Sequence, residues 1–161
     1  MLIRKSQPED VPRIMGIYDR ARKYMVDHGN PSQWINGYPS LELVLKDIMT
    51  GHGYVAVDGD DLVATFYFAI ENEPTYARIQ HGTWLNENTY GVVHRIAVDR
   101  HERGIATCCL EWCYQQIPNV RIDTHKNNQA MIRVLEKNGY TNCGFVFLDD
   151  GSERIAFQKT Q

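Results

Sequence analysis

One charged turn between an apolar strand and a helix has the residue types that bind phosphate groups. The apolar run Gly91–Val98 predicts a strand, and a helix is predicted from Gly104 to Gln116. A helix N-terminus leaves about four backbone N–H groups unpaired and carries a partial positive charge. Gly104 lets the backbone approach a ligand closely, and Ala106 keeps the first turn uncrowded. The turn therefore predicts a pyrophosphate site, with a plain strand-to-helix turn and solvated charges as the alternative.

Titratable side chains stand on the strands beside this turn. His94 lies within Gly91–Val98, and Asp123 and His125 follow in or just after a second predicted strand, Asn119–Thr124. Asp123 and His125 are two positions apart, so they share a face if the strand extends that far. An imidazole or a carboxylate in a cleft can take a proton from an attacking nucleophile. The alternative for each is a structural role, capping a neighbouring turn.

The apolar periodicity predicts one domain over residues 1–161 with an α/β fold. The expected order is strand, helix, helix, three strands, helix, strand, helix and two strands, which gives a mixed sheet with helices on both sides. The strands are expected at Met1–Lys5, Tyr54–Val57, Leu62–Ile70, Gly91–Val98, Asn119–Thr124, Tyr140–Leu148 and Glu153–Lys159. The helices are expected from Pro8 to Met25, from Ser40, at Gly104–Gln116 and at Asn128–Asn138.

Two irregular segments, 28–39 and 71–90, separate some of these elements. Long irregular segments in a compact domain are usually functional or mobile. Trp34, Tyr38 and Trp84 are aromatic residues of these segments that can line a pocket for an acceptor molecule, or can pin the segments to the core. The second segment also carries carboxylates that are expected to be solvated rather than to attract an amine, namely Glu71, Glu73 and Glu87.

Composition and charge argue against several classes of protein. With 17 Lys and Arg, 20 Asp and Glu and a net charge of −3, a nucleic-acid partner or a polybasic membrane surface is not expected. The apolar runs are shorter than the roughly 20 residues of a membrane span, and the N-terminus does not resemble a signal peptide. A cytoplasmic protein is therefore expected. The cysteines lack the second pair that zinc requires, so we expect buried thiols and no metal at Cys108, Cys109, Cys113 and Cys143.

These features resemble the GNAT superfamily of N-acetyltransferases. The family signature is [Gln/Arg]-x-x-Gly-x-[Gly/Ala] after a strand, and this chain reads Ile96-Ala97-Val98 and then His101-Glu102-Arg103-Gly104-Ile105-Ala106. The glycine and alanine positions match, whereas His101 stands in place of Gln or Arg. A second family block, Asn-x₁₀-Gly-[Phe/Tyr], matches Asn128 and Gly139-Tyr140. The order of elements agrees over nearly the whole chain.

The resemblance implies that the fourth and fifth strands splay apart and that acetyl-CoA lies in the notch. Its pantetheine arm would pair with the backbone from Ile96 to Val98, its pyrophosphate would bind the turn up to Ala106, and Asn128 would contact the CoA arm. The residues expected to bind the cosubstrate are Ile96, Ala97, Val98, His101, Glu102, Arg103, Gly104, Ile105, Ala106 and Asn128. The implied reaction is direct attack of a primary amine, on a small molecule or a peptide, on the thioester.

By the same resemblance, His94, Asp123 and His125 are the candidates for proton transfer, and several family members carry an acidic residue at the position of Asp123. Many members use a tyrosine as general acid where this chain has Leu135. Two alternatives stay open: another proton donor such as water, or a CoA-binding regulatory protein without transferase activity. Dimers are common in this family, so a homodimer joined by the terminal hairpin is also left open.

Overall fold

A computed structural model describes residues 1–99 and 104–161. Within these residues, seven strands form one mixed sheet in the order β1-β2-β3-β4-β5-β7-β6. The strands are β1 (Leu2–Lys5), β2 (Gly53–Asp58), β3 (Asp61–Ile70), β4 (Gly91–Val98), β5 (Asn119–Thr124), β6 (Thr141–Phe147) and β7 (Glu153–Thr160). The helices are α1 (Val11–Asp27), α2 (Leu41–Met49), α3 (Ile105–Gln116) and α4 (Gln129–Lys137), with 3₁₀ turns at Pro8–Asp10 and Pro74–Ala77. The predicted order of strands and helices is confirmed, and no helix in the described ranges is long and apolar enough to span a membrane.

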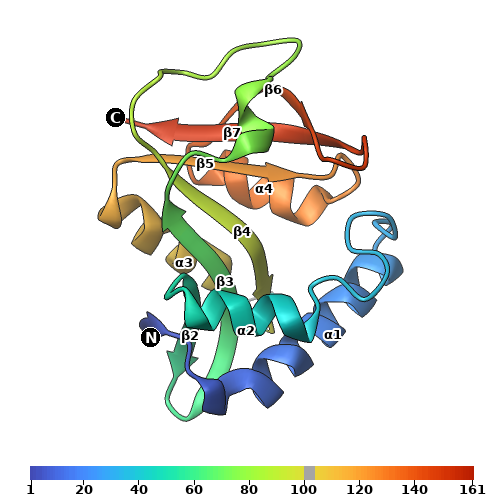
Figure 1. Cartoon of the computed structure of the whole chain (residues 1–161), viewed down its shortest axis with the longest axis vertical. Helices are drawn as coiled ribbons and strands as arrows, with labels where there is room; N and C mark the ends of the chain where they lie inside the picture. Colours follow the sequence, from blue (N-terminus) through green and yellow to red (C-terminus); the bar gives the residue numbers. More distant parts are fainter. Residues whose placement is uncertain (100–103) are drawn as a thin grey trace.

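Helices cover both faces of the sheet (Figure 1). On the front face, Ile17 of α1 and Val44 of α2 share a buried cluster with Val55 of β2. On the back face, Leu110 of α3 and Leu135 of α4 belong to a larger buried cluster with residues of the central strands. Successive side chains of a strand point to opposite faces of the sheet, so membership of one cluster or the other shows which face a residue occupies.

The irregular segment 71–90 covers the part of the front face that α1 and α2 leave open. Its aromatic residues Tyr76, Trp84 and Tyr90 pack on Val92 of β4 and Ala156 of β7 in a third buried cluster. The front of the sheet therefore carries two separate covers. A cleft lies between them.

The central strands β4 and β5 separate soon after they meet. They are parallel and pair only through Gly91 with Val120 and Val92 with Arg121. The other edge of β4 stays paired with β3 as far as Val98. Figure 1 shows the two ribbons diverging below their upper ends. The predicted splaying of the fourth and fifth strands is confirmed.

A bulge in β4 changes which side chains face the cleft. The register between β3 and β4 shifts beside Arg95, and Arg95 has a φ of 53°. Val93 and Ile96 both pack in the back cluster although they are three positions apart, which strict alternation forbids. Consequently His94 and Arg95, although adjacent in sequence, both line the cleft on the front face.

Several groups hold Arg95 in its left-handed conformation, which costs a residue with a Cβ about 1–2 kcal/mol. Its guanidinium forms a bidentate ion pair with Asp47, with N···O distances of 2.9 and 3.0 Å. It also donates to the hydroxyl of Tyr38 at 3.2 Å and lies 4.7 Å from the centroid of the Tyr67 ring. The Tyr18 hydroxyl donates to the Arg95 carbonyl at 2.9 Å. The bulge is thus fixed by side chains from both α1 and α2.

The cysteines follow the predicted pattern with one exception. Cys109, Cys113 and Cys143 are buried, but Cys108 is exposed because it lies on the side of α3 that faces solvent. Burial raises the pKa of Cys109 to about 12, so this thiol stays protonated at neutral pH. In the described part of the chain, no group of three or more His, Cys, Asp or Glu residues is arranged to hold a metal ion.

A buried polar residue ties the segment 71–90 to the sheet. Gln158 of β7 is 0% exposed. Its Oε1 accepts the backbone N–H of Leu85 at 2.8 Å, and its Nε2 donates to the Oδ1 of Asn119 at 2.7 Å. The amide oxygen is therefore satisfied only when the segment sits against β7, while the amide nitrogen links β7 to β5.

Replacing Gln158 with leucine should destabilise the protein by about 2–4 kcal/mol, because the Leu85 N–H and the Asn119 amide oxygen lose buried partners. Urea unfolding followed by circular dichroism measures this change. The exposed Gln115 on α3 provides the matched control, and Gln115→Leu should change the free energy of unfolding by less than about 0.5 kcal/mol. Equal stabilities for the two variants would contradict the anchoring role.

Candidate active site

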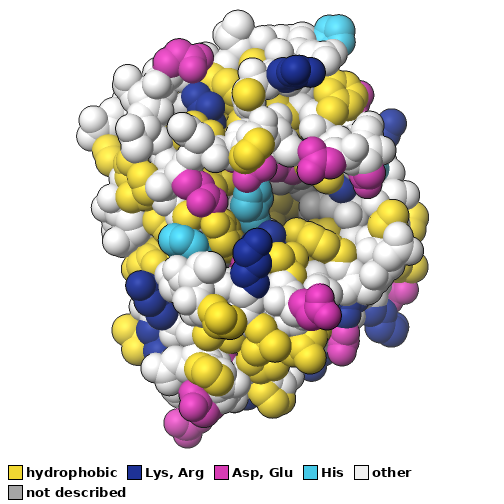
Figure 2. Space-filling view, viewed as in Figure 1, with side chains coloured by type: hydrophobic (Ala, Val, Ile, Leu, Met, Phe, Trp, Pro, Cys, Tyr) yellow, Lys and Arg dark blue, Asp and Glu magenta, His cyan; other side chains and the backbone are white. Residues whose placement is uncertain are grey.

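The cleft between the two covers of the sheet has a volume of about 1030 Å³. Its walls come from the segment 32–38, α2, the ends of β3 and β5, the bulged part of β4, and the 148–154 turn. Figure 2 shows that this face is hollowed near its centre, where histidine, basic and acidic side chains gather. The cleft reaches the opening between β4 and β5, since Ile96 and Ile122 both line it.

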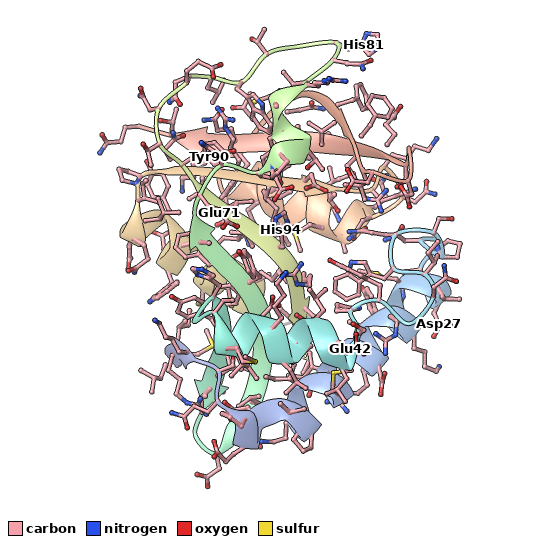
Figure 3. The ribbon with its side chains drawn as sticks, viewed as in Figure 1. Asp27, Glu42, Glu71, His81, Tyr90 and His94 are labelled. Atoms are coloured by element: carbon pink, nitrogen blue, oxygen red, sulfur yellow. The ribbon has the colours of Figure 1, made fainter. Side chains whose placement is uncertain are left out.

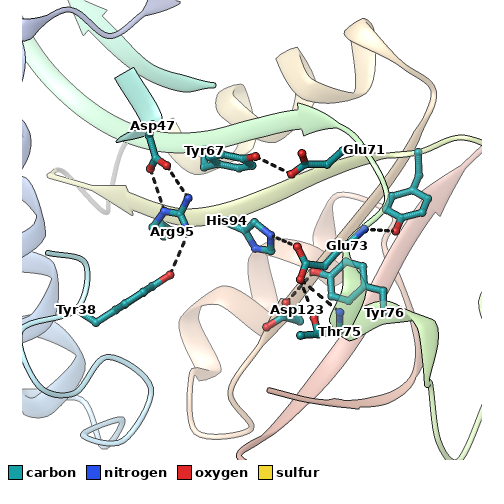
Figure 4. Close-up of polar contacts among 11 residues, drawn as sticks. Tyr38, Asp47, Tyr67, Glu71, Glu73, Thr75, Tyr76, His94, Arg95 and Asp123 are labelled. Atoms are coloured by element: carbon teal, nitrogen blue, oxygen red, sulfur yellow. Dashed lines mark hydrogen bonds and ion pairs between the residues drawn. The ribbon is translucent and has the colours of Figure 1, made fainter. Parts of the chain in front are cut away.

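His94 lies near the middle of this face of the molecule (Figure 3). It forms a hydrogen-bonded pair with Glu73 in the cleft, with 3.0 Å between Nε2 and Oε2 (Figure 4). The other oxygen of Glu73 accepts from the Thr75 hydroxyl at 3.1 Å, and the Glu73 backbone N–H donates to the Tyr90 hydroxyl at 2.8 Å. The bond from His94 lowers the pKa of Glu73, which is therefore ionised at neutral pH. The expectation that Glu73 is solvated is wrong, because its side chain is only 18% exposed.

The ionised Glu73 determines which nitrogen of His94 carries hydrogen. A carboxylate only accepts hydrogen bonds, so the Nε2 of His94 must be the donor. In the neutral imidazole the lone pair then lies on Nδ1, which is free to accept a proton. Thr75, Glu73 and His94 thus form a chain of hydrogen bonds that orients a base within the cleft.

Asp123 lies near this pair, on the front side of β5. It accepts a hydrogen bond of 2.7 Å from the Tyr76 hydroxyl. Burial raises the pKa of Asp123, while the neighbouring His94 acts to lower it. Burial also raises the pKa of Tyr76, so its hydroxyl stays a donor. The structure therefore brings two of the predicted titratable residues, His94 and Asp123, into the same part of the cleft.

His125 does not share the face of Asp123, because the strand does not extend far enough to include it. β5 ends at Thr124, and the chain turns immediately afterwards. The Nδ1 of His125 accepts the backbone N–H of Asn127 at 3.0 Å, which is the turn-capping role. Burial lowers the pKa of His125, and the positive charges of Arg154 and Lys126 act in the same direction. His125 is not among the residues that line the cleft.

The residues expected to bind the CoA arm fall along the open seam. Ile96 lines the cleft, and Ala97 and Val98 continue the edge of β4. Asn128 begins α4, where its side chain accepts from the N–H of Met131 at 3.2 Å and donates to Gln33 at 3.0 Å. Asn128 also lines the cleft.

The expected pyrophosphate turn is described only from Gly104 onward. Gly104 has a φ of 64° and caps the N-terminus of α3, and a Cβ added there would meet no atom of the described residues within 4 Å. Ile105 is buried and Ala106 half-buried in the first turn of the helix. His101, Glu102 and Arg103 lie outside the described residues. The described part offers a glycine-led helix start with open space in front of it.

Of the aromatic residues expected to bind the acceptor, Trp34 and Tyr38 line the cleft. Their rings are 6.2 Å apart and meet edge to face, and the Trp34 ring is 5.5 Å from that of Tyr18. Trp84 lies elsewhere: it is 8% exposed, donates its indole N–H to the Tyr76 carbonyl at 2.9 Å, and stacks on Arg121. The position of Trp84 favours the alternative role of pinning the segment 71–90 to the core.

Arg154, Tyr76 and Asp47 all contribute to this region. The sequence pointed to neither Arg154 nor Asp47, and it offered Tyr76 only as one of several aromatic residues in the segment 71–90. Arg154 lines the cleft, Tyr76 bonds to Asp123, and Asp47 pairs with Arg95. The sequence did contain one indication for Arg154. It lies two positions from Ala156 in the predicted strand, so both side chains are on the same, covered face of the sheet. Tyr76 and Asp47 had no such signal, because their partners are distant in sequence.

Comparisons with known proteins agree with this geometry. The sequence profile of the acetyltransferase (GNAT) family matches residues 17–140. A GNAT-family acetyltransferase from Streptococcus agalactiae has 32% identity and a TM-score of 0.91, over 99% of this chain and 95% of that one.

More distant structures share the fold. A GNAT-family acetyltransferase from Listeria monocytogenes has 17% identity and a TM-score of 0.71, covering 99% of this chain and 94% of that one. An N-acetyltransferase from Staphylococcus aureus has 17% identity and a TM-score of 0.66, covering 99% and 97%. No curated protein sequence gives a significant match. With a profile match over more than half of its length and a relative at 32% identity, the chain belongs to the GNAT family of acetyltransferases.

Proposed function

We propose that the protein transfers an acetyl group from acetyl-CoA to a primary amine of a small molecule or peptide, by direct attack within a ternary complex. The observation that carries this proposal is the oriented His94–Glu73 pair in a cleft that opens onto the separated strands β4 and β5. The pair supplies a proton acceptor for the amine. The separated strands supply a place for the acyl donor.

The described residues fit acetyl-CoA. Beyond Val92, the edge of β4 toward β5 has backbone groups without a strand partner, which a pantetheine amide can pair with as an added strand does. The helix start at Gly104 offers N–H groups and a positive dipole end to a pyrophosphate. Asn128 stands beside the same seam. When bound, acetyl-CoA supplies the thioester that the amine attacks.

His94 is the proposed general base. An alkylammonium has a pKa near 10.4 and must lose a proton before it can attack. The Nδ1 of His94 is positioned to accept that proton, and Glu73 stabilises the imidazolium that results. Asp123 adds negative charge close by, which favours entry of a cationic amine. His125 has no place in this scheme, because its Nδ1 is engaged in the turn after β5.

Neither Leu135, at the family's tyrosine position, nor Tyr140 serves as the general acid. Leu135 has no acidic proton and is 0% exposed in the back cluster, and Tyr140 is buried in the same cluster, outside the cleft lining. Thr124 is a residue of the cleft lining, and its buried hydroxyl has no hydrogen-bond partner among the described residues. We propose that this hydroxyl, or a water beside it, donates a hydrogen bond to the leaving sulfur.

The position of the pyrophosphate can be tested at Gly104. Gly104→Glu should weaken CoA binding by about 100-fold or more, because a carboxylate would stand where the phosphates bind. Gly104→Gln has nearly the same size and the same backbone strain without the charge, and should weaken binding by about tenfold at most. Titration calorimetry with CoA gives both values. Unchanged affinity in Gly104→Glu would refute this placement.

The base can be tested with His94→Gln and Glu73→Gln. His94→Gln should lower kcat/KM by about 10²–10⁴-fold, because the proton acceptor is lost. Glu73→Gln should cost up to about 100-fold through misorientation of the imidazole. Both should leave CoA affinity unchanged. Release of free thiol from acetyl-CoA, in the presence of a panel of amines, measures the rates.

The exposed His81, which lies outside the cleft lining, provides the matched control for removal of a histidine. His81→Gln should retain full activity. Full activity in His94→Gln would refute its role as base. CoA binding by the unaltered protein without turnover on any amine would favour the regulatory alternative.

A further inference from the structure

Arg154 is a buried cation in the cleft without a carboxylate partner. The residue is 5% exposed. Its Nη1 donates to the Glu153 carbonyl at 3.0 Å and its Nη2 to the Gln33 carbonyl at 3.2 Å. Within residues 1–99 and 104–161, no carboxylate oxygen lies within the 4.0 Å of an ion pair to it. A guanidinium has five N–H donors, so these two bonds leave donors unused.

The other buried arginines of the sheet's front face have their charge compensated. Arg95 is paired bidentately with Asp47. Arg121 lies between the rings of Trp84 and Tyr90, 4.2 and 4.0 Å from their centroids. Burying an unpaired charge is costly unless a partner arrives. Among the described residues, Arg154 is the one of these three that borders the cleft with neither a carboxylate in ion-pair contact nor an aromatic ring over its guanidinium. Asp123 and Asp150 act on it only through their charge.

The register of the sheet places Arg154 next to Asp123. Asp123 of β5 is opposite Ala156 of β7, and Arg154 is two positions from Ala156 on the same face. Diagonal neighbours of this kind have Cβ atoms about 7–8 Å apart. The positive charge of Arg154 acts to lower the pKa of Asp123, as expected for neighbours that do not touch. A cationic donor and an acidic group therefore stand side by side on the cleft floor.

We propose that the acceptor is an amine that also carries a carboxylate, such as an α-amino acid, and that Arg154 binds this carboxylate. This inference rests on the proposed acetyl transfer. The two charged groups of an α-amino acid are separated by one carbon, so the molecule can present its amine to His94 and Asp123 and its carboxylate to Arg154. A planar guanidinium matches the two oxygens of a carboxylate better than any other side chain does. Arg154 is then a specificity-determining residue.

The test compares amino acids with the amines made by removing their carboxylate. Suitable pairs are tyrosine and tyramine, histidine and histamine, and lysine and cadaverine. For the pair with the best acceptor, the unaltered protein should show a kcat/KM about 10- to 100-fold higher for the amino acid. In Arg154→Gln this ratio should fall to near one. Arg154→Lys keeps the charge without the planar fork and should give an intermediate ratio.

Arg133, exposed on α4 and outside the cleft lining, provides the matched control, and Arg133→Gln should keep the ratio of the unaltered protein. The Arg154 bond to the Gln33 carbonyl gives this residue a structural part as well. A purely structural role would lower the rates of both members of a pair and leave their ratio unchanged. That result, or no preference for any amino acid in the unaltered protein, would overturn the proposal. Circular dichroism and CoA affinity check that each variant is folded.

Calorimetric binding of the same pairs, with CoA present, separates this inference from the proposed function. Tighter binding of an amino acid than of its amine, lost in Arg154→Gln, would support the carboxylate site even if no acetyl transfer occurred. In that case the transferase proposal would fail and the binding site would stand. Equal binding of both members, or binding of neither, would overturn the carboxylate site.

Discussion

The requirement that backbone polar groups find partners governs the centre of this fold. β4 and β5 share only two residue pairs before they separate, so the remaining N–H and C=O groups on that edge of β4 need another partner. Both covers of the front face stop at this seam, with α1 and α2 on one side and the segment 71–90 on the other. The open seam is therefore a consequence of the sheet's own geometry, and under the proposed function an extended, amide-bearing ligand would supply the missing partners.

The bulge at Arg95 connects this seam to the chemistry of the cleft. Without it, His94 and Arg95 would face opposite sides of the sheet. With it, Arg95 turns to Asp47 and His94 turns to Glu73, so one backbone irregularity creates one ion pair and one hydrogen-bonded pair (Figure 4). The first contact stabilises the bulge and neutralises its cation. The second fixes the tautomer of the imidazole, so the strain at one residue is linked directly to the orientation of the base.

The sequence predicted the parts of this structure that local periodicity determines. Strands, helices and the helix start at Gly104 follow from apolar spacing and a glycine, and the family resemblance supplied the splayed strands. His94 and Asp123 were found because they lie on regular strands next to the seam. The positions of Glu73 and Tyr76 beside these residues could not be predicted, because an irregular segment is placed by contacts such as the Tyr76–Asp123 bond, which spans 47 residues. His125 was expected on the face of Asp123 only if the strand continued to it, and β5 ends one residue earlier, at Thr124.

Under the proposed function, the two ligands are recognised by different kinds of groups. The seam would offer mainly backbone groups to acetyl-CoA, so most side chains along it can change. A structure with 17% identity keeps a TM-score of 0.71 over 99% of this chain, which shows that the fold itself persists while most side chains change. The acceptor end depends on side chains from the irregular segments and from β7, where a single change alters charge. Acceptor specificity should therefore differ between family members much more than the acetyl-CoA site does. Charged residues such as Arg154, rather than the fold, should indicate which acceptor a member uses.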